Sequence, residues 1–460
     1  MLDETPFRTP HSPFCIDKGQ EMTGLWTDSS GFLGNPGVRR LLWALAVLVI
    51  ILLVRTLAQG AAPLQSSAAP APVDYNPYAE IVRLQKRLEL FPEDAAAYAG
   101  LGLAHLQQVR EDGDASHYQQ AEAAFQASLS RDEKQADALV GMGMLALARH
   151  DFVAAIPWAE AVLAVAPHSV EAIGLLVDAN VELGRYDEAL AKGQAMVDLR
   201  PGVASFSRAS YLRELNGDSA GAIQAMQRAL EVAVPGTESW RWTAVQVGHL
   251  HFSLGEWQEA EEYYQAALQS HAAYPFALAG RARVSAAQGD TTAAIRLYSQ
   301  ALDRLPLPEF AIPLGDLYTL TGQPEKAAEQ YGLVGVIQQL NQAGGMSVDL
   351  ELALFEADYG DPATALALAR QAYAARPSIY AADALAWALH RNGLDAEAQP
   401  YSAESLRLGT RDALLHYHAG VIAQALGDNE MASQHLQTAL EINPAFSLLY
   451  ASDARERMGR

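Results

Sequence analysis

The chain has 460 residues, of which 54 are acidic and 32 basic, so its formal net charge at pH 7 is −22. This charge argues against a nucleic-acid partner, and the length argues against a single core, because cores stop growing near ~250–300 residues. Half of the residues are hydrophobic but only 8% are aromatic, and roughly a fifth are alanine, a composition that favours packed helices.

Residues 1–38 mix proline, glycine, serine and scattered charges without periodicity, which predicts a disordered cytoplasmic tail. Translation could start at Met1 or at Met22. The only cysteine, Cys15, lies in this tail, so the rest of the chain can form no structural disulfide and use no thiol chemistry.

Residues 39–58 contain the strongest targeting signal, the apolar run Leu41–Val54 with arginines on both sides. A helix of fourteen residues is about 21 Å long, short of the ~30 Å hydrocarbon core but at the upper limit of a signal peptide's apolar region. We favour a single-pass membrane anchor, because the apolar character continues through residues 56–58. Signal cleavage near Gly60 is the alternative. Two arginines precede the run and one follows, which predicts a cytoplasmic N-terminus and an extracytoplasmic bulk.

Residues 59–75 form an Ala/Pro/Ser linker, and an internal repeat follows. A glycine followed five residues later by alanine recurs every 33–38 residues. The glycines are Gly184, Gly217, Gly255, Gly289, Gly322, Gly360, Gly393 and Gly427.

Each repeat unit is interpreted as two helices joined at this glycine, which can take the left-handed conformation that ends the first helix. A small residue usually stands seven positions before the glycine, as at Gly248 and Ala282, and would let the two helices cross closely. One unit cannot bury its own apolar face, so only the stack is stable.

The segments VELGRYDEAL at 181–190 and SLGEWQEAEEYYQAAL at 253–268 closely resemble the tetratricopeptide repeat. The resemblance implies an all-α fold, a right-handed α-solenoid of about ten helix-turn-helix repeats over 76–446, preceded by the transmembrane or signal helix and followed by a capping helix at 447–460. The C-terminal stretch is also similar to bacterial envelope-associated proteins of this family. The expected units lie near 95–135, 136–169, 170–203, 204–236, 241–274, 275–307, 308–345, 346–378, 379–412 and 413–446.

Some segments depart from the family pattern. The unit at 205–233 lacks its aromatic residue and its proline, and residues 106–117 and 342–345 lengthen two connections. The two lengthened connections are either hinges or contact loops, or tolerated surface insertions.

The family's superhelix implies a concave groove lined by the first helix of each unit. Carried onto this chain, the groove positions combine carboxylates with aromatic and histidine side chains. They are Asp178, Glu182, Trp242, His249, Asp316, Asp358, Tyr380, Asp383, Trp387, His390 and Tyr417.

Such a groove would select a basic or amphipathic protein segment, with the aromatic rings supplying buried contact area. The carboxylates could instead be solvated surface groups, and Trp387 and Tyr417 could pack between neighbouring helices. The family's best-known peptide clamp reads a terminal carboxylate with lysine and asparagine, and that set is missing here.

We therefore predict a membrane-tethered, non-catalytic scaffold of a bacterial envelope that binds another protein, without metal or cofactor. The pairs His249/His251 and His416/His418 point about 200° apart on a helix, which does not suit a metal site. No phosphate-binding loop or nucleophile elbow stands out. The alternative is a secreted or periplasmic carrier or sensor of basic ligands or cations that uses the same groove.

Overall fold

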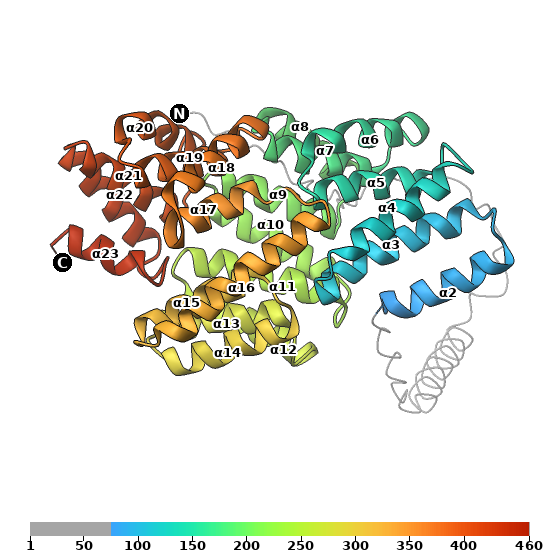
Figure 1. The fold of residues 1–460 in the computed structure, drawn as a ribbon. Coiled ribbons are helices and arrows are strands. Elements are labelled where there is room, and N and C mark those ends of the chain that lie inside the picture. The colour runs from blue at the N-terminus through green and yellow to red at the C-terminus, as the bar shows by residue number, and fades with distance from the viewer. Residues whose placement is uncertain (1–74, 460) are drawn as a thin grey trace, which may run out of the picture. The chain divides into compact units, whose positions relative to one another are not determined.

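The computed structural model describes residues 75–459, and this part of the chain consists of 22 helices without a strand (Figure 1). The first is α2 (Pro77–Leu90), which begins where the Asn76 side chain accepts a hydrogen bond from the Ala79 N–H at 3.0 Å. The predicted tail, membrane segment and most of the linker lie outside the described residues. Among the helices at 75–459, none is both long and apolar enough to span a bilayer.

After α2, twenty helices follow in ten pairs, and the last helix is α23 (Tyr450–Arg457). The first helices of the pairs are α3 (Ala95–Asp112), α5 (Ala136–Ala148), α7 (Val170–Glu182), α9 (Val203–Leu215), α11 (Glu238–Ser253), α13 (Pro275–Ala287), α15 (Pro308–Leu320), α17 (Asp349–Tyr359), α19 (Ile379–Arg391) and α21 (Ala413–Ala425). The second helices are α4 (Ser116–Leu129), α6 (Phe152–Val165), α8 (Tyr186–Leu199), α10 (Ser219–Val232), α12 (Trp257–Ser270), α14 (Thr291–Arg304), α16 (Pro324–Ala343), α18 (Pro362–Ala375), α20 (Asp395–Ser405) and α22 (Asn429–Ile442). Each helix packs mainly on its neighbours in the chain, which makes the fold a helical solenoid.

The predicted turn glycines join the two helices of a pair, and seven of the eight have a positive φ. Gly360 is the exception, with a φ of −123°. The second pair has His150 at this place with a φ of 59°, and its ring Nδ1 lies 2.8 Å from the carbonyl oxygen of Ser347. Since a carbonyl oxygen can only accept, the His150 Nδ1 carries the hydrogen and donates it. This hydrogen bond connects the strained turn to a loop that is distant in the sequence.

Small residues let the first helices approach the aromatic rings of the second helices. Tyr264 on α12 is fully buried between Gly248 on α11 and Gly280 on α13. A β-carbon on either glycine would lie 2.5 Å from the ring's Cε1 atom. The predicted role of the small residue before the turn is therefore confirmed at Gly248, and one ring fills the space between two consecutive pairs.

The two lengthened connections belong to the longest helices and contact each other. Helix α3 has 18 residues and α16 has 20, whereas most others have 13 or 14. The Gln119 side-chain amide donates to the Ala343 carbonyl at 3.2 Å, and Gly344 lies against Ala115. Both insertions thus serve as contact loops between segments more than 200 residues apart in the sequence.

This contact is part of a regular row that we name the seam. The turns inside the first five pairs lie against the loops that follow the last five pairs, in the same order. The contacting positions are Gly113 with Leu305, His150 with Ser347, Gly184 with Pro377, Gly217 with Gly409, and Gly255 with Pro444. By contrast, nothing outside the local backbone lies within 4 Å of a β-carbon placed on Gly289, Gly322, Gly393 or Gly427.

Gly184 and Gly217 make the closest backbone contacts of the seam. Their φ values are 69° and 75°, and a β-carbon at either position would overlap the carbonyl oxygen of Pro377 or Gly409. Glycine is needed at both sites for two reasons, its left-handed conformation and the space that its missing side chain leaves for the facing loop.

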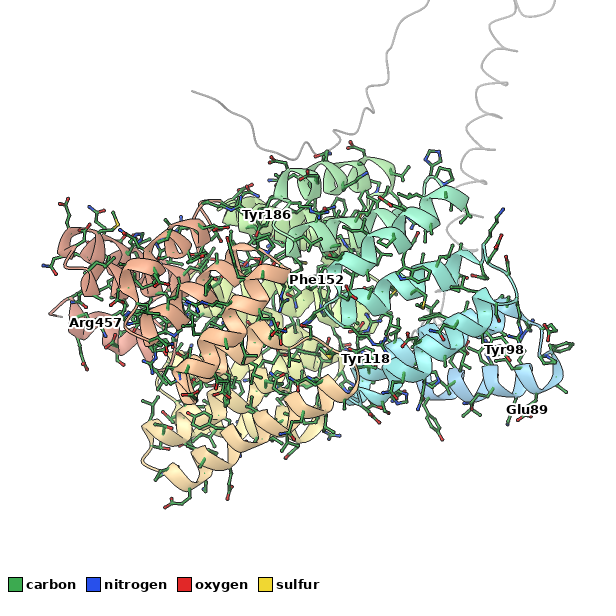
Figure 2. The ribbon with its side chains drawn as sticks, turned by 45° about the horizontal axis from the view of Figure 1, so that its top comes forward. Glu89, Tyr98, Tyr118, Phe152, Tyr186 and Arg457 are labelled. Atoms are coloured by element: carbon green, nitrogen blue, oxygen red, sulfur yellow. The ribbon has the colours of Figure 1, made fainter. Side chains whose placement is uncertain are left out.

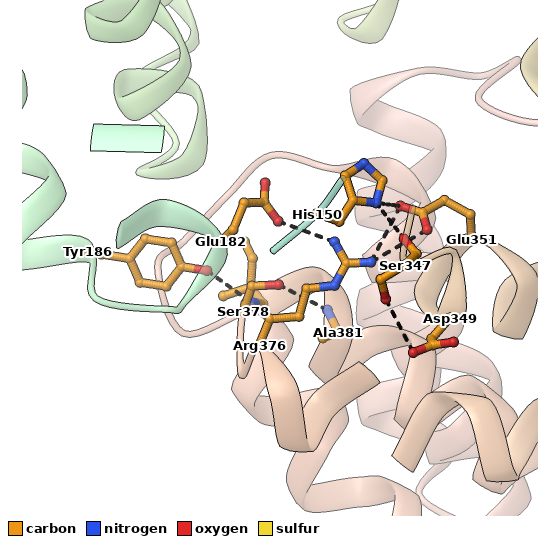
Figure 3. A network of polar contacts seen from close by, with 10 residues as sticks. His150, Glu182, Tyr186, Ser347, Asp349, Glu351, Arg376, Ser378 and Ala381 are labelled. Atoms are coloured by element: carbon orange, nitrogen blue, oxygen red, sulfur yellow. Dashed lines mark hydrogen bonds and ion pairs between the residues drawn. The ribbon is translucent and has the colours of Figure 1, made fainter. Parts of the chain in front are cut away.

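Arg376, in the loop before α19, is the charged centre of the seam (Figure 3). Its buried guanidinium lies between two carboxylates, 3.8 Å from Glu182 on α7 and 3.4 Å from Glu351 on α17. It also stands 5.5 Å from the ring centre of Phe152, which Figure 2 labels on α6. Beside it, the Tyr186 hydroxyl accepts a hydrogen bond from the Ile379 N–H at 2.8 Å, across 193 positions of sequence.

Candidate functional site

One cavity that contains predicted site residues lies mainly along the first helices of pairs three to six. We name it the groove cavity; its volume is about 510 Å³, which is within the range of ligand-binding clefts. It is lined by Asp178, Ser207, Arg208, Ser210, Tyr211, Glu214, Met226, Trp242, Gln246, His249, Leu250, Ser253 and Arg283.

A second cavity of about 140 Å³ continues from it toward the seam, and we name it the seam cavity. Glu214, Ser253 and Arg283 line both cavities. Its other walls come from the second half of the array and consist of Tyr380, Thr410, Arg411, Asp412, Ala413, Leu414, Asn443 and Phe446. A further cavity of about 420 Å³, formed by the loop after α20 together with α21 and α22, is lined by none of the predicted site residues.

Three of the predicted residues line the groove cavity. Asp178 accepts two hydrogen bonds from the Arg208 guanidinium, at 2.8 and 2.6 Å, so its charge is already neutralised within the chain. His249 lies 2.8 Å from the Tyr264 hydroxyl; burial, with the charge of Arg283, lowers the pKa of His249 to about 3 and keeps it neutral. Trp242 is partly exposed and offers the cavity an aromatic surface.

Tyr380 is the fourth predicted residue at the cavities, where it lines the seam cavity together with Glu214 and Asp412. Burial raises the pKa of Glu214 to about 7, and the negative charge of Asp412 adds to this rise. Burial likewise raises the pKa of Asp412, whose Oδ1 accepts the Leu414 N–H at 2.9 Å at the start of α21. Neither carboxylate has a cationic partner among residues 75–459 within ion-pair distance.

Glu182 lies in the seam rather than at a cavity. Burial raises the pKa of Glu182, and the positive charge of Arg376 opposes this shift. Two of the predicted groove carboxylates, Asp178 and Glu182, are therefore paired with arginines of the chain itself. The unpaired ones, Glu214 and Asp412, were not among the predicted residues.

The remaining six predicted residues come together near the C-terminus. Trp387 and Tyr417 are each only 2% exposed, and the last helix, α23, covers them. The Trp387 indole donates to Asp358 at 2.7 Å, as does the Tyr450 hydroxyl at 2.5 Å. The Tyr417 hydroxyl donates to Asp453 at 2.6 Å. These rings fill a core between the last units and leave no exposed face for a partner.

The carboxylates of this group are also engaged within the chain. Asp383 is 2.9 Å from the buried His418 ring; burial lowers the pKa of His418, but Asp383, Asp358 and Asp412 together outweigh burial and the net shift is upward. Asp316 accepts from the Tyr331 and Tyr359 hydroxyls at 2.8 and 2.9 Å, and burial raises its pKa to about 6. His390 pairs with Asp395 at 2.6 Å.

A fixed position in the repeat could have identified one of the cavity residues that the prediction left out. Asp178, His249 and Arg283 each precede their turn glycine by six residues. The same offset from Gly217 gives Tyr211, which lines the groove cavity on α9. None of the predicted groove residues belongs to this unit, which departs from the family pattern by lacking its aromatic residue and its proline. Asp412 follows no such offset, since it belongs to a loop between pairs.

Taken together, the two cavities offer apolar surface, several aromatic side chains, and both carboxylates and arginines. Such a lining suits non-covalent recognition. Among the described residues there is no group of three or more histidine, cysteine, aspartate or glutamate side chains arranged to hold a metal ion.

Comparisons with known proteins agree with the helix pairs. Three family models, each described as tetratricopeptide repeat, match the chain: one at 208–277, 245–307 and 279–339, one at 146–191 and one at 413–446. No curated protein sequence matches the chain.

Several solved structures are similar to the chain, all at low identity. The hetero-tetramer Cut9–Hcn1 of the APC/C is 18% identical, with 82% of this chain and 81% of that chain covered and a TM-score of 0.38. A tetratricopeptide repeat protein from Parabacteroides merdae is 18% identical, covering 56% of this chain and 99% of its own, with a TM-score of 0.32. The MamA protein is 19% identical, with 37% of this chain and 91% of that chain covered and a TM-score of 0.29.

Proposed function

From the premise that this chain carries tetratricopeptide repeats, we propose that it is a non-catalytic scaffold that holds a segment of another protein in the groove cavity. Solenoid repeats present extended concave surfaces that typically mediate protein–protein interaction. The single observation that carries the proposal is the groove cavity itself, where Trp242, Met226 and Leu250 provide apolar contact beside charged side chains. Trp242 is the candidate anchor, because aromatic residues in such clefts contribute most of the binding energy.

The partner segment in this proposal is basic or amphipathic. Asp178 is neutralised by Arg208, so the attraction for positive charge comes from the carboxylate end of the two cavities and from the net charge of −22. Binding of such a segment weakens as salt is added, because the long-range part of the attraction is screened.

Site-specific photocrosslinking tests the proposal. A benzoylphenylalanine in place of Gln246, which lines the groove cavity, is expected to crosslink one partner in cells of the source organism. The same probe at Gln265, an exposed residue of α12, is the control. With the partner purified, Trp242→Ala should weaken binding at least about tenfold. Equal crosslinking at both positions, or unchanged affinity of the Trp242 variant, would contradict the proposal.

We also propose that residues 41–58 tether the scaffold to a bacterial membrane as a single-pass anchor, with the N-terminus cytoplasmic and the repeats extracytoplasmic. The apolar run and the arginines before it support this arrangement. In fractionated cells the full-length chain should stay with membranes after alkaline carbonate washing. A soluble product whose N-terminus lies near Ala61 would instead support export after signal cleavage.

A further inference from the structure

Two pairs of histidine rings in the described chain meet through their Nδ1 atoms. These atoms lie 3.0 Å apart between His105 on α3 and His117 on α4, and also 3.0 Å apart between His416 on α21 and His435 on α22. Each pair joins the two helices of one unit, so spacing along a single helix could not reveal it. The first pair stands at the lengthened connection 106–117, for which the proposed function has no use.

A third ligand atom lies beside the first pair. The amide oxygen of Gln120, one turn along α4, is 3.1 Å from the Nδ1 of His117. Two imidazole nitrogens and an amide oxygen therefore gather around one point of α4. Imidazole is a good ligand for copper, nickel and zinc, and an oxygen beside two nitrogens is a common set for Cu²⁺ and Ni²⁺.

The distance between the two Nδ1 atoms indicates which metal ions fit. An imidazole nitrogen binds such an ion at about 2.0–2.1 Å, so two of them at a right angle lie about 2.8–3.0 Å apart. At the tetrahedral angle that zinc prefers, the separation is about 3.3–3.4 Å. The observed 3.0 Å corresponds to the right angle, which is the arrangement in the square-planar and tetragonal sites of Cu²⁺ and Ni²⁺.

The surroundings of the two rings favour the protonation state that a metal ion needs. Burial, with the neighbouring charge of His117, lowers the pKa of His105 to about 4, so this ring is neutral at pH 7. The Nε2 of His117 lies 3.5 Å from the Asp112 carboxylate, which favours hydrogen on Nε2 and leaves the Nδ1 lone pair free. Without metal, the Nδ1–H of His105 donates to that lone pair. Metal binding moves this hydrogen to the Nε2 of His105.

The second pair has the same distance but lacks these supports. Neither Nδ1 atom has another hydrogen-bond partner among the described residues. Burial, the neighbouring ring and the positive charge of Arg411 lower the pKa of His416 to about 4. A positive charge this close also repels a metal cation, whereas the first pair has a carboxylate beside it.

We infer that His105, His117 and Gln120 form a binding site for Cu²⁺ or Ni²⁺, with the Nδ1 atoms of both histidines and the Oε1 atom of Gln120 as ligands. Water completes the coordination. The site is separate from the groove cavity and goes beyond the proposed function. It also gives the lengthened connection a role, because a bound ion would hold together the two helices whose turn enters the seam, where Gly113 meets Leu305.

Titration of the full-length chain at pH 7.5 with Cu²⁺, supplied as its glycine complex, tests the inference. The ion at this site should show two imidazole nitrogens in pulsed electron paramagnetic resonance and should raise the unfolding temperature. His117→Asn should weaken binding at this site at least about tenfold and remove the two-imidazole signal. Gln120→Ala should weaken it about threefold, and Ni²⁺ should give the same order of affinities.

His435→Asn is the matched control, because it makes the same change in the second pair. It should leave Cu²⁺ affinity, the two-imidazole signal and the metal-induced rise in unfolding temperature as in the parent. Equal losses in His117→Asn and His435→Asn, or a parent signal with fewer than two imidazoles, overturn the inference. If His117→Asn fails to fold, the parent signal and the affinity of Gln120→Ala still decide. The crosslinking result at Gln246 would stand in either case, so the two proposals can fail separately.

Discussion

At the scale of single residues, the partly buried carboxylates divide into those that accept hydrogen bonds from other side chains and those that do not. Asp358 accepts hydrogen bonds from Trp387 and Tyr450, whereas the carboxylate of Glu214 accepts none from the described residues. An uncompensated carboxylate makes folding costly only while it is ionised. The pKa of Glu214 rises from 4.5 to about 7 on folding, so the folded state binds the extra proton in that interval.

The free energy of unfolding should therefore fall as pH rises from about 4.5 to about 7, because the folded state must give up a proton that the unfolded state has already lost. Asp412 acts in the same direction, whereas the hydroxyls of Tyr211 and Tyr380 stay neutral throughout this pH range. Urea unfolding at several pH values measures the slope. Glu214→Gln should flatten it, and Glu231→Gln on the exposed surface of α10 should leave it intact; an identical slope in all three chains would refute the assignment.

Trp387 provides a second residue-scale prediction, because its position in the core differs from the groove position that the resemblance implied. Its ring stacks on His418 at 4.1 Å between ring centres, and its indole donates to Asp358. Trp387→Ala should cost about 3–5 kcal/mol of unfolding free energy, as for other buried aromatic residues. Trp242→Ala should cost far less, since Trp242 lines a cavity. Urea unfolding of both variants measures the difference, and similar costs would contradict the two placements.

At the scale of helices, stability depends on the match between a small residue on a first helix and a ring on a second helix. Tyr264 fits between Gly248 and Gly280, and Phe125 between Gly102 and Gly141 in the same way. A ring shared by two pairs couples them more tightly than two separate contacts would.

The same substitution at two glycines isolates this effect. Gly248→Ala would bring a methyl group to 2.5 Å from the Tyr264 ring and should destabilise the chain by about 1–3 kcal/mol, as overpacking does. Gly332→Ala, on α16, meets nothing within 4 Å and should stabilise the chain by about 0.5–1 kcal/mol through helix propensity. Thermal unfolding distinguishes the two signs. A stabilising Gly248→Ala would show that the ring can move aside at no cost.

The features that could be predicted from the sequence are those that depend on residues close together in the chain. The helix pairs and turn glycines depend on neighbours within about a dozen positions, so the repeat pattern predicts them. The contact between residues 106–117 and 342–345 was not predictable, although both segments stood out, because no local pattern tells which distant loop a turn will meet. The same holds for Glu214 and Asp412, which share a cavity although 198 positions separate them.

At the scale of the whole array, the seam adds long-range contacts to a fold that usually relies on neighbouring units. Arg376 has a side chain 7% exposed and is the most buried charge in the seam contacts, between Glu182 and Glu351. Removing it would leave two carboxylates facing each other without a counter-charge.

Arg376→Met should therefore cost about 2–4 kcal/mol, a value reduced from that of a fully buried pair because Glu351 is partly exposed. Hydrogen exchange should rise around Tyr186 and Ile379, whose hydrogen bond lies beside Arg376. Arg370→Met on α18 is the control, since its pair with Glu397 at 3.6 Å is exposed and should contribute less than about 1 kcal/mol. If both variants behave alike, the seam contributes no stability.

The order of contacts in the seam also bears on how such a chain can change its number of repeats. In an ordinary solenoid a unit can be gained or lost, because each unit meets only its neighbours. Here the turn of each of the first five pairs fits a loop five pairs further on, and Gly184 and Gly217 fit theirs at backbone distance. A duplication or deletion between the two rows would put every turn against the wrong loop at once. The seam therefore fixes the copy number of the repeats between its two rows, and it favours evolution of this array by substitution rather than by recombination.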